Sequence, residues 1–308
     1  MTRILIASRG DLEPIAALFR AELPSHEVLT EPPIPDVPIP YLVAGRPAPG
    51  VIAGVARVEL VLSLNAGIEH LLAGGEVPRE VPIIHLVDEG LSEGMADWVL
   101  GHALSWHRNL GLYRAQQERG VWLQQPEKLA RERLVTVLGA GAIGGPIAAH
   151  FVRFGFETRV WSRSGRPVEG ATSFAGRSQL LEAVRDADIV VDLLPMTAET
   201  ENLVDAALFS AMRRGGFFIN GGRGGHVVDA DLIAALDQGQ LSGAALDVFR
   251  IEPLPESHPF WRHPKVIVSP HVAAPTHPQT AVKVIAETIR RHERGEPLAH
   301  VVDRALGY

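Results

Sequence analysis

The fold is decided by the stretch Val135-Thr136-Val137-Leu138-Gly139-Ala140-Gly141-Ala142-Ile143-Gly144-Gly145. An apolar, β-branched run ends at Gly139 and apolar residues resume after Gly145, which predicts a strand, a tight turn and a helix. Gly139 would make the turn, Gly141 would let a pyrophosphate approach the backbone, and Gly144 would let helix and strand pack closely. The residues expected to bind a dinucleotide here are Gly139, Gly141, Ala142, Ile143 and Gly144.

A second predicted strand strengthens the assignment of the glycine pattern to a dinucleotide site. Glycine spacing of this kind alone also occurs in ordinary loops. That strand, Thr158–Trp161, leads into Trp161-Ser162-Arg163-Ser164, where the ribose-binding residue should lie and where no carboxylate stands. A carboxylate there would bind a free 2′-hydroxyl, whereas Arg163 between two hydroxyls suits a 2′-phosphate. The sequence therefore favours NADPH, with NADH possible. The alternative is that Arg163 and Arg166 are solvated loop cations.

Composition limits the classes of protein that this chain can belong to. With 308 residues, 46% hydrophobic and 21% charged, it should form two globular domains. The net charge of −7 argues against nucleic acid as the main partner. No cysteine is present, which excludes disulfides, thiolate metal sites and cysteine nucleophiles. No apolar run is long enough for a secretory signal or a membrane span, so a cytoplasmic protein without a membrane partner is expected.

Strands alternate with helices along the chain, which predicts parallel, doubly wound sheets. The expected fold class is α/β, with two Rossmann-like doubly wound parallel-sheet domains and an interdomain cleft. A discontinuous, flavodoxin-like substrate-binding domain takes residues 1–98 plus 280–308, and an NAD(P)-binding Rossmann domain takes 99–279. Helices are predicted at 11–21, 91–117, 229–237 and 279–294. Strands are predicted at 4–7, 27–29, 41–43, 60–63, 83–86, 135–138, 158–161, 189–193, 217–220, 243–248 and 266–268.

Two segments of the first half carry further expectations. Prolines punctuate Glu31–Pro40, so this segment should be a connector. In Ser63–Leu71 a strand runs into small residues, and exposed N–H groups at Ala66, Gly67 and Ile68 would suit a small carboxylate. Taken alone, the second segment would be an ordinary turn.

Three polar features follow successive predicted strands, where α/β sheets place ligands. They are an arginine in a glycine loop, an acid after a strand and a histidine after a strand. Each could be incidental, but their order and placement make coincidence improbable. The three segments are Asn220-Gly221-Gly222-Arg223-Gly224, Leu246-Asp247-Val248-Phe249-Arg250-Ile251-Glu252-Pro253 and Ser269-Pro270-His271-Val272-Ala273-Ala274.

With these motifs the chain resembles the D-isomer-specific 2-hydroxyacid dehydrogenase family over nearly its whole length. Within that family it is most similar to the glyoxylate/hydroxypyruvate reductase A branch. The motifs behind the resemblance are the Asn65-Ala66-Gly67 loop, the glycine fingerprint, the three segments above, Leu194-Pro195-Met196-Thr197-Ala198-Glu199-Thr200, Val160-Trp161-Ser162-Arg163-Ser164, Ser173-Phe174-Ala175-Gly176-Arg177 and Val302-Asp303-Arg304-Ala305-Leu306-Gly307-Tyr308.

The resemblance implies a reductase of small 2-oxoacids that yields 2-hydroxyacids. Such a reaction needs a hydride, a proton and a cation for the carboxylate. The implied catalytic residues are His271 as proton donor, Glu252 as the group that favours its charged form, and Arg223 as the clamp on carboxylate and carbonyl. The implied substrate-binding residues are Asn65, Ala66, Gly67 and Arg223. The implied cofactor contacts outside the glycine loop are Trp161, Ser162, Arg163, Ser164, Leu194, Pro195 beside the adenosine half, and Asp247 against the nicotinamide carboxamide.

One departure from the branch concerns Gly45, where relatives carry a bulky aromatic residue. The absence of that aromatic side chain would widen the entrance of the substrate pocket, so a larger 2-oxoacid is an alternative substrate.

Alternative functions come from other classes of protein. One is a nucleotide-sensing, corepressor-like binding protein. Formate and phosphoglycerate oxidation are weaker rivals, because Glu252 argues against the first and the substrate loop lacks cations for the second. No histidine spacing predicts a metal site. The apolar face of the long helix, with Trp98 and Trp106, suggests a homodimer.

Overall fold

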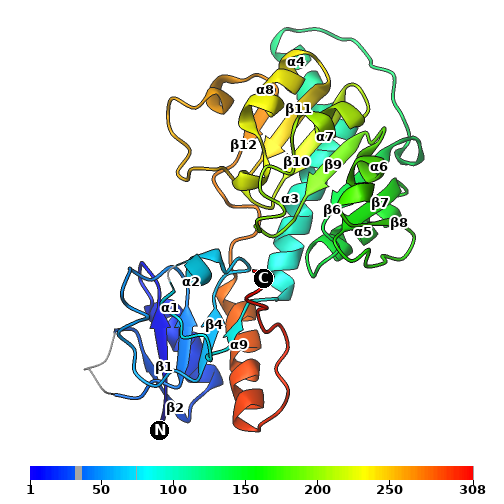
Figure 1. The fold of residues 1–308 in the computed structure, drawn as a ribbon. Helices are drawn as coiled ribbons and strands as arrows, with labels where there is room; N and C mark the ends of the chain where they lie inside the picture. The colour runs from blue at the N-terminus through cyan, green and yellow to red at the C-terminus, as the bar shows by residue number, and fades with distance from the viewer. Residues whose placement is uncertain (32–36, 74, 308) are drawn as a thin grey trace. The chain divides into compact units, whose positions relative to one another are not determined.

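The computed structural model describes residues 1–31, 37–73 and 75–307, and the chain divides into two compact units (Figure 1). The first unit comprises residues 1–91 and 276–308, and the second comprises residues 92–275. The chain crosses between them at 91/92 and 275/276, whereas the sequence placed the boundaries at 98/99 and 279/280. The first boundary differs because Met95, Trp98 and Val99 pack into the core of the second unit.

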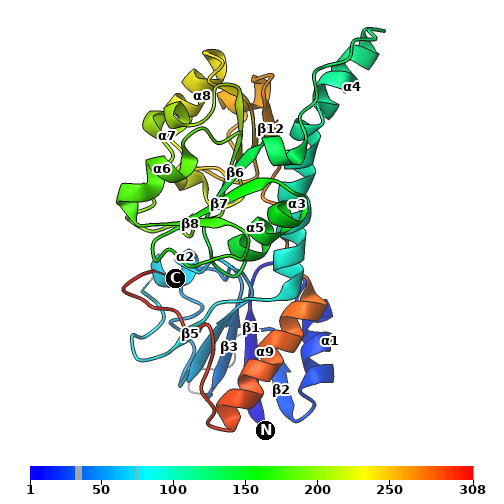
Figure 2. The same cartoon turned by 90° about the vertical axis from the view of Figure 1, so that its right-hand side faces the viewer.

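The first unit is a five-stranded parallel sheet in the order β2-β1-β3-β4-β5, which is the flavodoxin-like order. Its strands are β1 Thr2–Ala7, β2 His26–Leu29, β3 Tyr41–Ala44, β4 Leu60–Ser63 and β5 Ile83–Ile84. Its helices are α1 Glu13–Glu22, α2 Glu69–Ala73 and α9 Pro278–Glu293. Figure 2 shows α1 and α9 packed side by side along the sheet. Strands β3 and β4 are buried along their whole length, as expected of a sheet covered on both faces.

The second unit is a seven-stranded parallel sheet in the order β12-β11-β10-β9-β6-β7-β8. This is the dinucleotide-binding strand order with one further strand, and the order reverses between β6 and β9. Its strands are β6 Leu134–Leu138, β7 Glu157–Ser162, β8 Thr172–Ala175, β9 Ile189–Asp192, β10 Gly216–Asn220, β11 Leu241–Leu246 and β12 Val266–Val268. Its helices are α3 Glu89–His107 (the first residues of which belong to the first unit), α4 Leu110–Glu118, α5 Gly144–Arg153, α6 Leu180–Val184, α7 Ala206–Ala211 and α8 Asp229–Asp237, with short 3-10 turns η1 Ala130–Glu132, η2 Arg177–Gln179, η3 Gly224–His226 and η4 Pro259–Arg262.

Alternating strand residues serve two separate cores on the two faces of this sheet. In β10, Phe217 and Ile219 pack into the core with α3 and α5, whereas Phe218 packs into the core with α6, α7 and α8. This period of two is what a pleated strand imposes. Figure 2 shows α6, α7 and α8 on one side of the sheet and α3 and α5 on the other. Both faces are therefore covered, and the carboxyl edge of the sheet remains as the place for a ligand.

Some predicted elements differ from the structure. The single helix expected at 91–117 is two helices, because Asn109 adopts a left-handed backbone with φ of 56° between α3 and α4. Strand β8 was not expected, and its residues are mostly exposed. Helix α8 has the predicted bounds, and α9 lies within the first unit as anticipated. Of the predicted Glu31–Pro40 connector, residues 32–36 lie outside the described residues.

No helix among the described residues is long and apolar enough to cross a membrane.

Candidate active site

The glycine turn between β6 and α5 has the geometry that its sequence predicts. Gly139 has a φ of 113°, a backbone conformation that favours glycine, and its N–H donates to the Trp161 carbonyl at 2.8 Å. A Cβ built on Gly144 would lie 2.0 Å from the Gly139 carbonyl oxygen. Only a residue without a side chain fits at Gly144, so strand and helix meet at a separation that glycine alone permits.

Gly141 differs, because the protein's own packing does not require a glycine there. A Cβ built on it would meet no atom within 4 Å, and the residue is exposed together with Ala142. The open backbone lies before the N-terminus of α5, where the first N–H groups have no partner within the helix. Open backbone beside a helix N-terminus fits the pyrophosphate of a dinucleotide.

The segment after β7 contains the residues predicted to select the cofactor. The indole nitrogen of Trp161 donates to the Gly176 carbonyl at 2.9 Å, and Ser162 accepts the Arg166 N–H at 3.1 Å. These contacts fix the ends of β7 and β8 beside each other. Arg163 and Ser164 are exposed in the intervening turn. The chemistry of this donor set fits a 2′-phosphate, and the role of each residue stays a prediction.

The loop after β10 positions Arg223. Asn220 is fully buried, accepts the Gly222 N–H at 3.0 Å through its side-chain oxygen and donates to the Arg223 carbonyl at 3.1 Å. The Arg223 guanidinium donates to the Gly222 carbonyl at 2.7 Å. A Cβ on Gly224 would lie 1.9 Å from the Phe249 carbonyl carbon, so this loop presses against the segment that follows β11.

The loops after β11 and β12 bring Glu252 and His271 together. The imidazole Nδ1 of His271 lies 2.7 Å from Oε2 of Glu252, and Oε1 of the same carboxylate accepts the Phe249 N–H at 2.9 Å. The side chain of His271 is 39% exposed and that of Glu252 is 29% exposed, so the pair is accessible to a ligand. Strands β10, β11 and β12 are neighbours in a parallel sheet, so Arg223, Glu252 and His271 all follow one edge of it.

Asp247 organises the backbone around His271. Its carboxylate is 1% exposed and accepts hydrogen bonds from the Ser269 hydroxyl at 2.6 Å and from the N–H groups of Val272 and Ala273, both at 2.9 Å. Its carbonyl accepts the His271 N–H at 2.8 Å. His271 itself has a φ of 55°, so four contacts hold a histidine in a conformation that is uncommon outside glycine. The contact of Asp247 with a nicotinamide carboxamide stays a prediction.

A buried Asp–His pair beside Arg223 was missed at the level of sequence. Asp192 and His226 are both fully buried, and Oδ2 of Asp192 lies 2.7 Å from Nδ1 of His226. The sequence offered one signal, a histidine three residues after Arg223 in a glycine-rich loop. Leu194 and Pro195, predicted as cofactor contacts, adjoin this pair, since the Leu194 N–H donates to Asp192 at 3.1 Å.

The first unit contains the predicted carboxylate-binding turn Asn65-Ala66-Gly67. The Ser63 hydroxyl accepts the Asn65 N–H at 3.0 Å and donates to the Asn65 carbonyl at 2.8 Å. The side-chain nitrogen of Asn65 is buried and has no hydrogen-bond partner among the described residues. A donor is thus available in this turn, and its role toward a carboxylate stays a prediction.

Gly45 lies at the end of β3, and the space beside it is occupied. A Cβ built on Gly45 would lie 2.3 Å from Oγ and 2.8 Å from Cβ of Ser8. The Ser8 hydroxyl also accepts the Arg46 N–H at 3.2 Å. The absence of a side chain at Gly45 therefore accommodates Ser8, and the expectation of a wider pocket stays a prediction.

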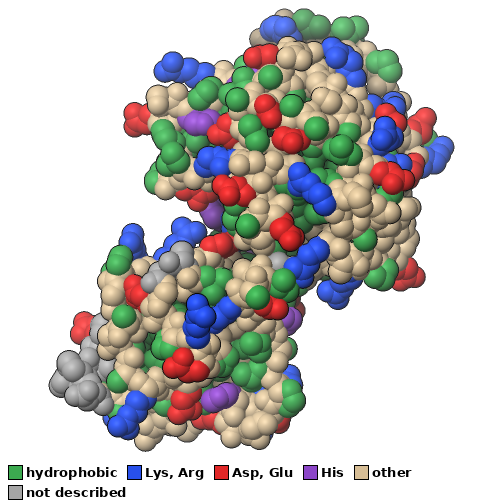
Figure 3. Space-filling view, viewed as in Figure 1, with side chains coloured by type: hydrophobic (Ala, Val, Ile, Leu, Met, Phe, Trp, Pro, Cys, Tyr) green, Lys and Arg blue, Asp and Glu red, His purple; other side chains and the backbone are tan. Residues whose placement is uncertain are grey.

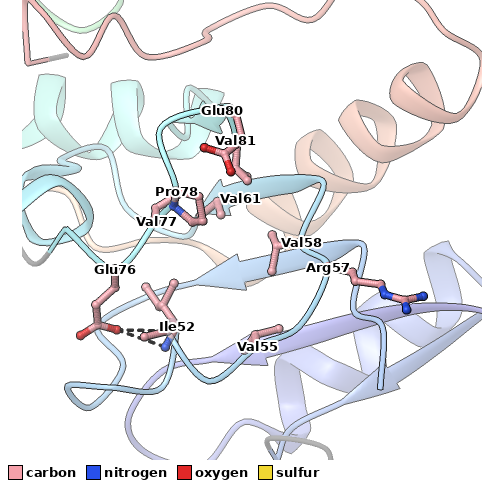
Figure 4. Close-up of a pocket in the computed structure, with 11 residues that line it drawn as sticks. Ile52, Val55, Arg57, Val58, Val61, Glu76, Val77, Pro78, Glu80 and Val81 are labelled. Carbon is pink, nitrogen blue, oxygen red and sulfur yellow. Dashed lines mark hydrogen bonds between the residues drawn. The ribbon is translucent and has the colours of Figure 1, made fainter. Parts of the chain in front are cut away.

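A pocket of about 270 Å³ in the first unit contains none of the predicted site residues (Figure 4). Its lining is mainly aliphatic and includes three charged side chains, Arg57, Glu76 and Glu80. The Glu76 carboxylate accepts N–H groups of Gly50 at 2.9 Å and Ile52 at 3.2 Å, and these bonds lower the pKa of Glu76. Glu76 thereby closes a turn of the chain. Among the described residues, no group of three or more His, Cys, Asp or Glu could hold a metal ion.

Comparison with known proteins gives consistent matches. Residues 100–273 match the family model described as D-isomer specific 2-hydroxyacid dehydrogenase, NAD binding domain. The chain is 38% identical to glyoxylate/hydroxypyruvate reductase A of Serratia proteamaculans over 291 residues, which cover 93% of each chain.

Two solved structures are similar over the full length. A D-isomer specific 2-hydroxyacid dehydrogenase from Xanthobacter autotrophicus, in complex with NADPH and MES, has a TM-score of 0.94 and 35% identity, covering 100% of this chain and 99% of that one. An NADPH-dependent glyoxylate/hydroxypyruvate reductase from Sinorhizobium meliloti, in complex with NADP and sulfate, has a TM-score of 0.93 and 32% identity, covering 100% of both chains.

Proposed function

The chain belongs to the D-isomer-specific 2-hydroxyacid dehydrogenase family, and from that premise we propose that it reduces small 2-oxoacids with NADPH, hydroxypyruvate to the D-2-hydroxyacid and glyoxylate to the achiral glycolate. The family fixes the general class, an NAD(P)-dependent oxidoreductase acting on 2-hydroxyacids or 2-oxoacids. The observation that carries the proposal is the 2.7 Å contact between His271 and Glu252 at the sheet edge that also bears Arg223. This edge of the sheet thus offers a proton donor in His271, a carboxylate partner in Glu252 and a cation in Arg223.

His271 acts as the proton donor through Nε2. Its Nδ1 is engaged by the Glu252 carboxylate, so the proton on Nε2 is the one available for transfer. When bound, the reduced nicotinamide supplies a hydride to the carbonyl carbon. Nε2 then gives its proton to the carbonyl oxygen, the C=O π bond becomes an O–H and a C–H bond, and the neutral imidazole recovers a proton from water. Arg223 binds the substrate carboxylate and offsets negative charge on the reacting oxygen.

NADPH is the proposed cofactor, with NADH as a poorer one. Arg163, flanked by Ser162 and Ser164, supplies a cation and two hydroxyls where a carboxylate would select a free ribose hydroxyl. The complexes of the two similar structures contain NADPH and NADP, which supports this choice. In the glycine loop, the open backbone at Gly141 supports a pyrophosphate site.

The sequence placed the dimer face on Trp98 and Trp106, but both pack against the core of the second unit, where their indole N–H groups donate to Ser269 at 3.2 Å and to Ser242 at 2.8 Å. The homodimer that we propose is instead formed through the segment around α4. Trp122 is 94% exposed, and it is accompanied by other exposed apolar side chains in and after α4. Figure 3 shows hydrophobic side chains at this end of the second unit. These side chains are Leu110, Leu112, Val121, Leu123 and Leu129. We propose a second copy of this chain as the partner that covers these side chains, because large exposed apolar patches on monomers often mark interaction sites. Sedimentation analysis of the protein and of Trp122→Glu tests this, and a wild-type monomer contradicts it.

The test of the reaction is a panel of glyoxylate, hydroxypyruvate, phenylpyruvate, formate and phosphoglycerate with each nicotinamide cofactor. The proposal expects turnover of the two small 2-oxoacids with NADPH. A preference for phenylpyruvate supports the alternative based on Gly45. Binding of NADPH without turnover of any compound supports the corepressor-like alternative. The expected cytoplasmic location stays a prediction.

A further inference from the structure

Asp192 and His226 form a fully buried ionisable pair that the proposed chemistry does not use. Asp192 is the last residue of β9, and His226 is the last residue of η3, which follows Arg223. Their contact of 2.7 Å joins the end of β9 to the turn that follows its neighbour β10. Burying two such groups is costly unless every polar atom is satisfied, so the remaining contacts of the pair decide what it does.

Those contacts reach both loops that flank the pair. On the side of the predicted cofactor contacts, Asp192 accepts the Leu194 N–H at 3.1 Å, and Nε2 of His226 lies 3.2 Å from the Pro195 carbonyl. On the side of Arg223, the Asp192 carbonyl accepts the Gly221 N–H at 3.1 Å. The His226 N–H donates to the Arg223 carbonyl at 3.2 Å.

The protonation of the ring follows from its partners. The Pro195 carbonyl can only accept, and the Asp192 carboxylate accepts when ionised, so both ring nitrogens of His226 carry a proton. Burial on its own lowers the pKa of His226, and the charge and hydrogen bond of Asp192 together with the Pro195 carbonyl outweigh burial, with Arg223 opposing them. The net result is a raised pKa and an imidazolium that donates in two directions.

The ring is also a packing surface for the Arg223 loop. A Cβ built on Gly222 would lie 3.3 Å from Cε1 of His226 and 3.1 Å from the Leu194 carbonyl oxygen. Gly222 thus lies directly against the ring and against the segment after β9. Since the Arg223 guanidinium donates to the Gly222 carbonyl, a shift of the ring changes the direction of that guanidinium.

We propose that Asp192 and His226 are positioning residues that lock the Leu194–Pro195 segment to the Arg223 loop, so that cofactor binding sets the direction of the Arg223 guanidinium. The inference rests on the proposed function, since it takes Arg223 as the substrate clamp and Pro195 as a cofactor contact. It goes beyond that function by assigning a coupling between the two.

Three variants test the pair. His226→Asn keeps a donor toward Asp192 and loses the one toward Pro195, whereas His226→Gln places a donor near the position of Nε2. We expect His226→Asn to weaken NADPH binding and raise the KM for glyoxylate by roughly 10- to 100-fold each, with a smaller change in kcat. His226→Gln should recover NADPH binding in part. His107→Asn is the matched control, because His107 is buried in the same unit against Phe156, away from Arg223.

Comparison with His107→Asn distinguishes a positioning role of His226 from a purely structural role. A purely structural role predicts that His226→Asn and His107→Asn both lower Tm while Kd for NADPH and KM for glyoxylate remain those of the wild type. That result in a folded His226→Asn protein overturns the proposal.

A measurement on the wild-type protein covers the case in which the variants do not fold. Hydrogen–deuterium exchange with NADPH alone should slow the amides of Leu194–Thr197 and those of Gly221–Val227 together. Protection of the first segment with unchanged exchange in the second overturns the coupling. Because this readout needs no turnover, it stands apart from the proposed reaction, which fails separately if no 2-oxoacid is reduced.

Discussion

Nδ1 of His271 lies 2.7 Å from Oε2 of Glu252, and the second oxygen of that carboxylate is occupied by the Phe249 N–H at 2.9 Å. Both ends of the carboxylate are engaged, so the imidazole is held by a group that is itself fixed. This relationship connects a backbone turn after β11 with the chemistry of a histidine after β12. In the proposed reaction His271 therefore offers the proton, and Glu252 contributes only by holding the ring of His271.

Replacing the two residues should have unequal effects. His271→Ala should lower kcat by about 10²- to 10⁴-fold, because a positioned proton donor contributes that much. Glu252→Gln should lower kcat less, because the amide keeps an oxygen that can accept from Nδ1 of His271 but loses the charge-assisted hydrogen bond that holds the ring. Fluorescence titration with NADPH is the control. If His271→Ala loses cofactor binding, the residue is not the proton donor.

The two glycines of the turn before α5 should respond oppositely to alanine. Gly144→Ala should destabilise the fold by about 3 kcal/mol or more, because its Cβ would overlap the Gly139 carbonyl at 2.0 Å. Gly141→Ala has open space around its Cβ and should keep the wild-type Tm. It should nevertheless weaken NADPH binding by roughly tenfold or more, since the methyl group occupies the room for a pyrophosphate. Thermal melts and NADPH titration of both variants check this. Normal NADPH affinity in Gly141→Ala would place the phosphates elsewhere.

Arg163→Glu should reverse the cofactor preference. Loss of a guanidinium–phosphate contact and introduction of like charge should raise the Kd for NADPH by roughly 10- to 100-fold and leave NADH binding nearly unchanged. Arg166→Glu changes the same charge in the same turn and serves as the matched control. Equal effects of the two variants would mean that the turn acts only through its general charge.

The free energy of unfolding should decrease on acidification because of three histidines that take no part in the proposed reaction. Burial lowers the pKa of His85, His102 and His107, with the His300 charge adding to the effect at His85 and Arg133 and Arg108 adding to it at His107. A depressed pKa means that the unfolded chain takes up protons first, so the stabilisation is present above the ordinary value of about 6.5 and is lost as pH falls through the folded-state pKa.

Urea unfolding at about pH 7.5 and about pH 5 measures this loss. The free energy of unfolding should be lower at the acidic pH, and the decrease should be smaller in His102→Asn, which removes one of the three groups. An unchanged decrease in that variant contradicts the assignment to His102.

The alternating, doubly wound architecture of the second unit could be predicted because local signals agree with one another. The β-branched run before Gly139, the glycine spacing and the helix at 229–237 each point to the same alternating architecture, and the structure has it. The break at Asn109 could not be predicted, because a left-handed asparagine between two helical segments leaves no composition signal. Strand β8 was missed since an exposed edge strand lacks the buried apolar pattern.

The candidate site also has a part that the sequence could predict and a part that it could not. The placement of Arg223, Glu252 and His271 at one edge could be predicted because each follows a predicted strand and neighbouring parallel strands end at the same edge, whereas their catalytic roles stay predictions. The Asp192–His226 pair could not, because its members are 34 residues apart and meet only where β9 and β10 lie side by side. The role of Asp247 as the anchor of the His271 loop likewise depends on β11 and β12 being neighbours.

Gly45 and Ser8 should behave as a coupled pair. The two residues follow neighbouring strands, β3 and β1, and the Cβ of any residue at position 45 would meet the Ser8 side chain at 2.3 Å. Gly45→Ala should therefore cost about 1–3 kcal/mol of unfolding free energy. Ser8→Gly should cost less, because it removes one hydrogen bond from the Arg46 N–H.

The double variant should be more stable than the sum of the single effects predicts, because removal of the Ser8 side chain makes room for the new methyl group. Urea unfolding of the four proteins gives this coupling energy, and additive effects would mean that the backbone moves instead. The same four proteins test the wider pocket, since turnover of glyoxylate and phenylpyruvate can be compared in each. If Gly45 admits a larger 2-oxoacid, the double variant should lose phenylpyruvate turnover and keep that of glyoxylate. Unchanged turnover of both compounds would show that the glycine serves packing against Ser8 alone.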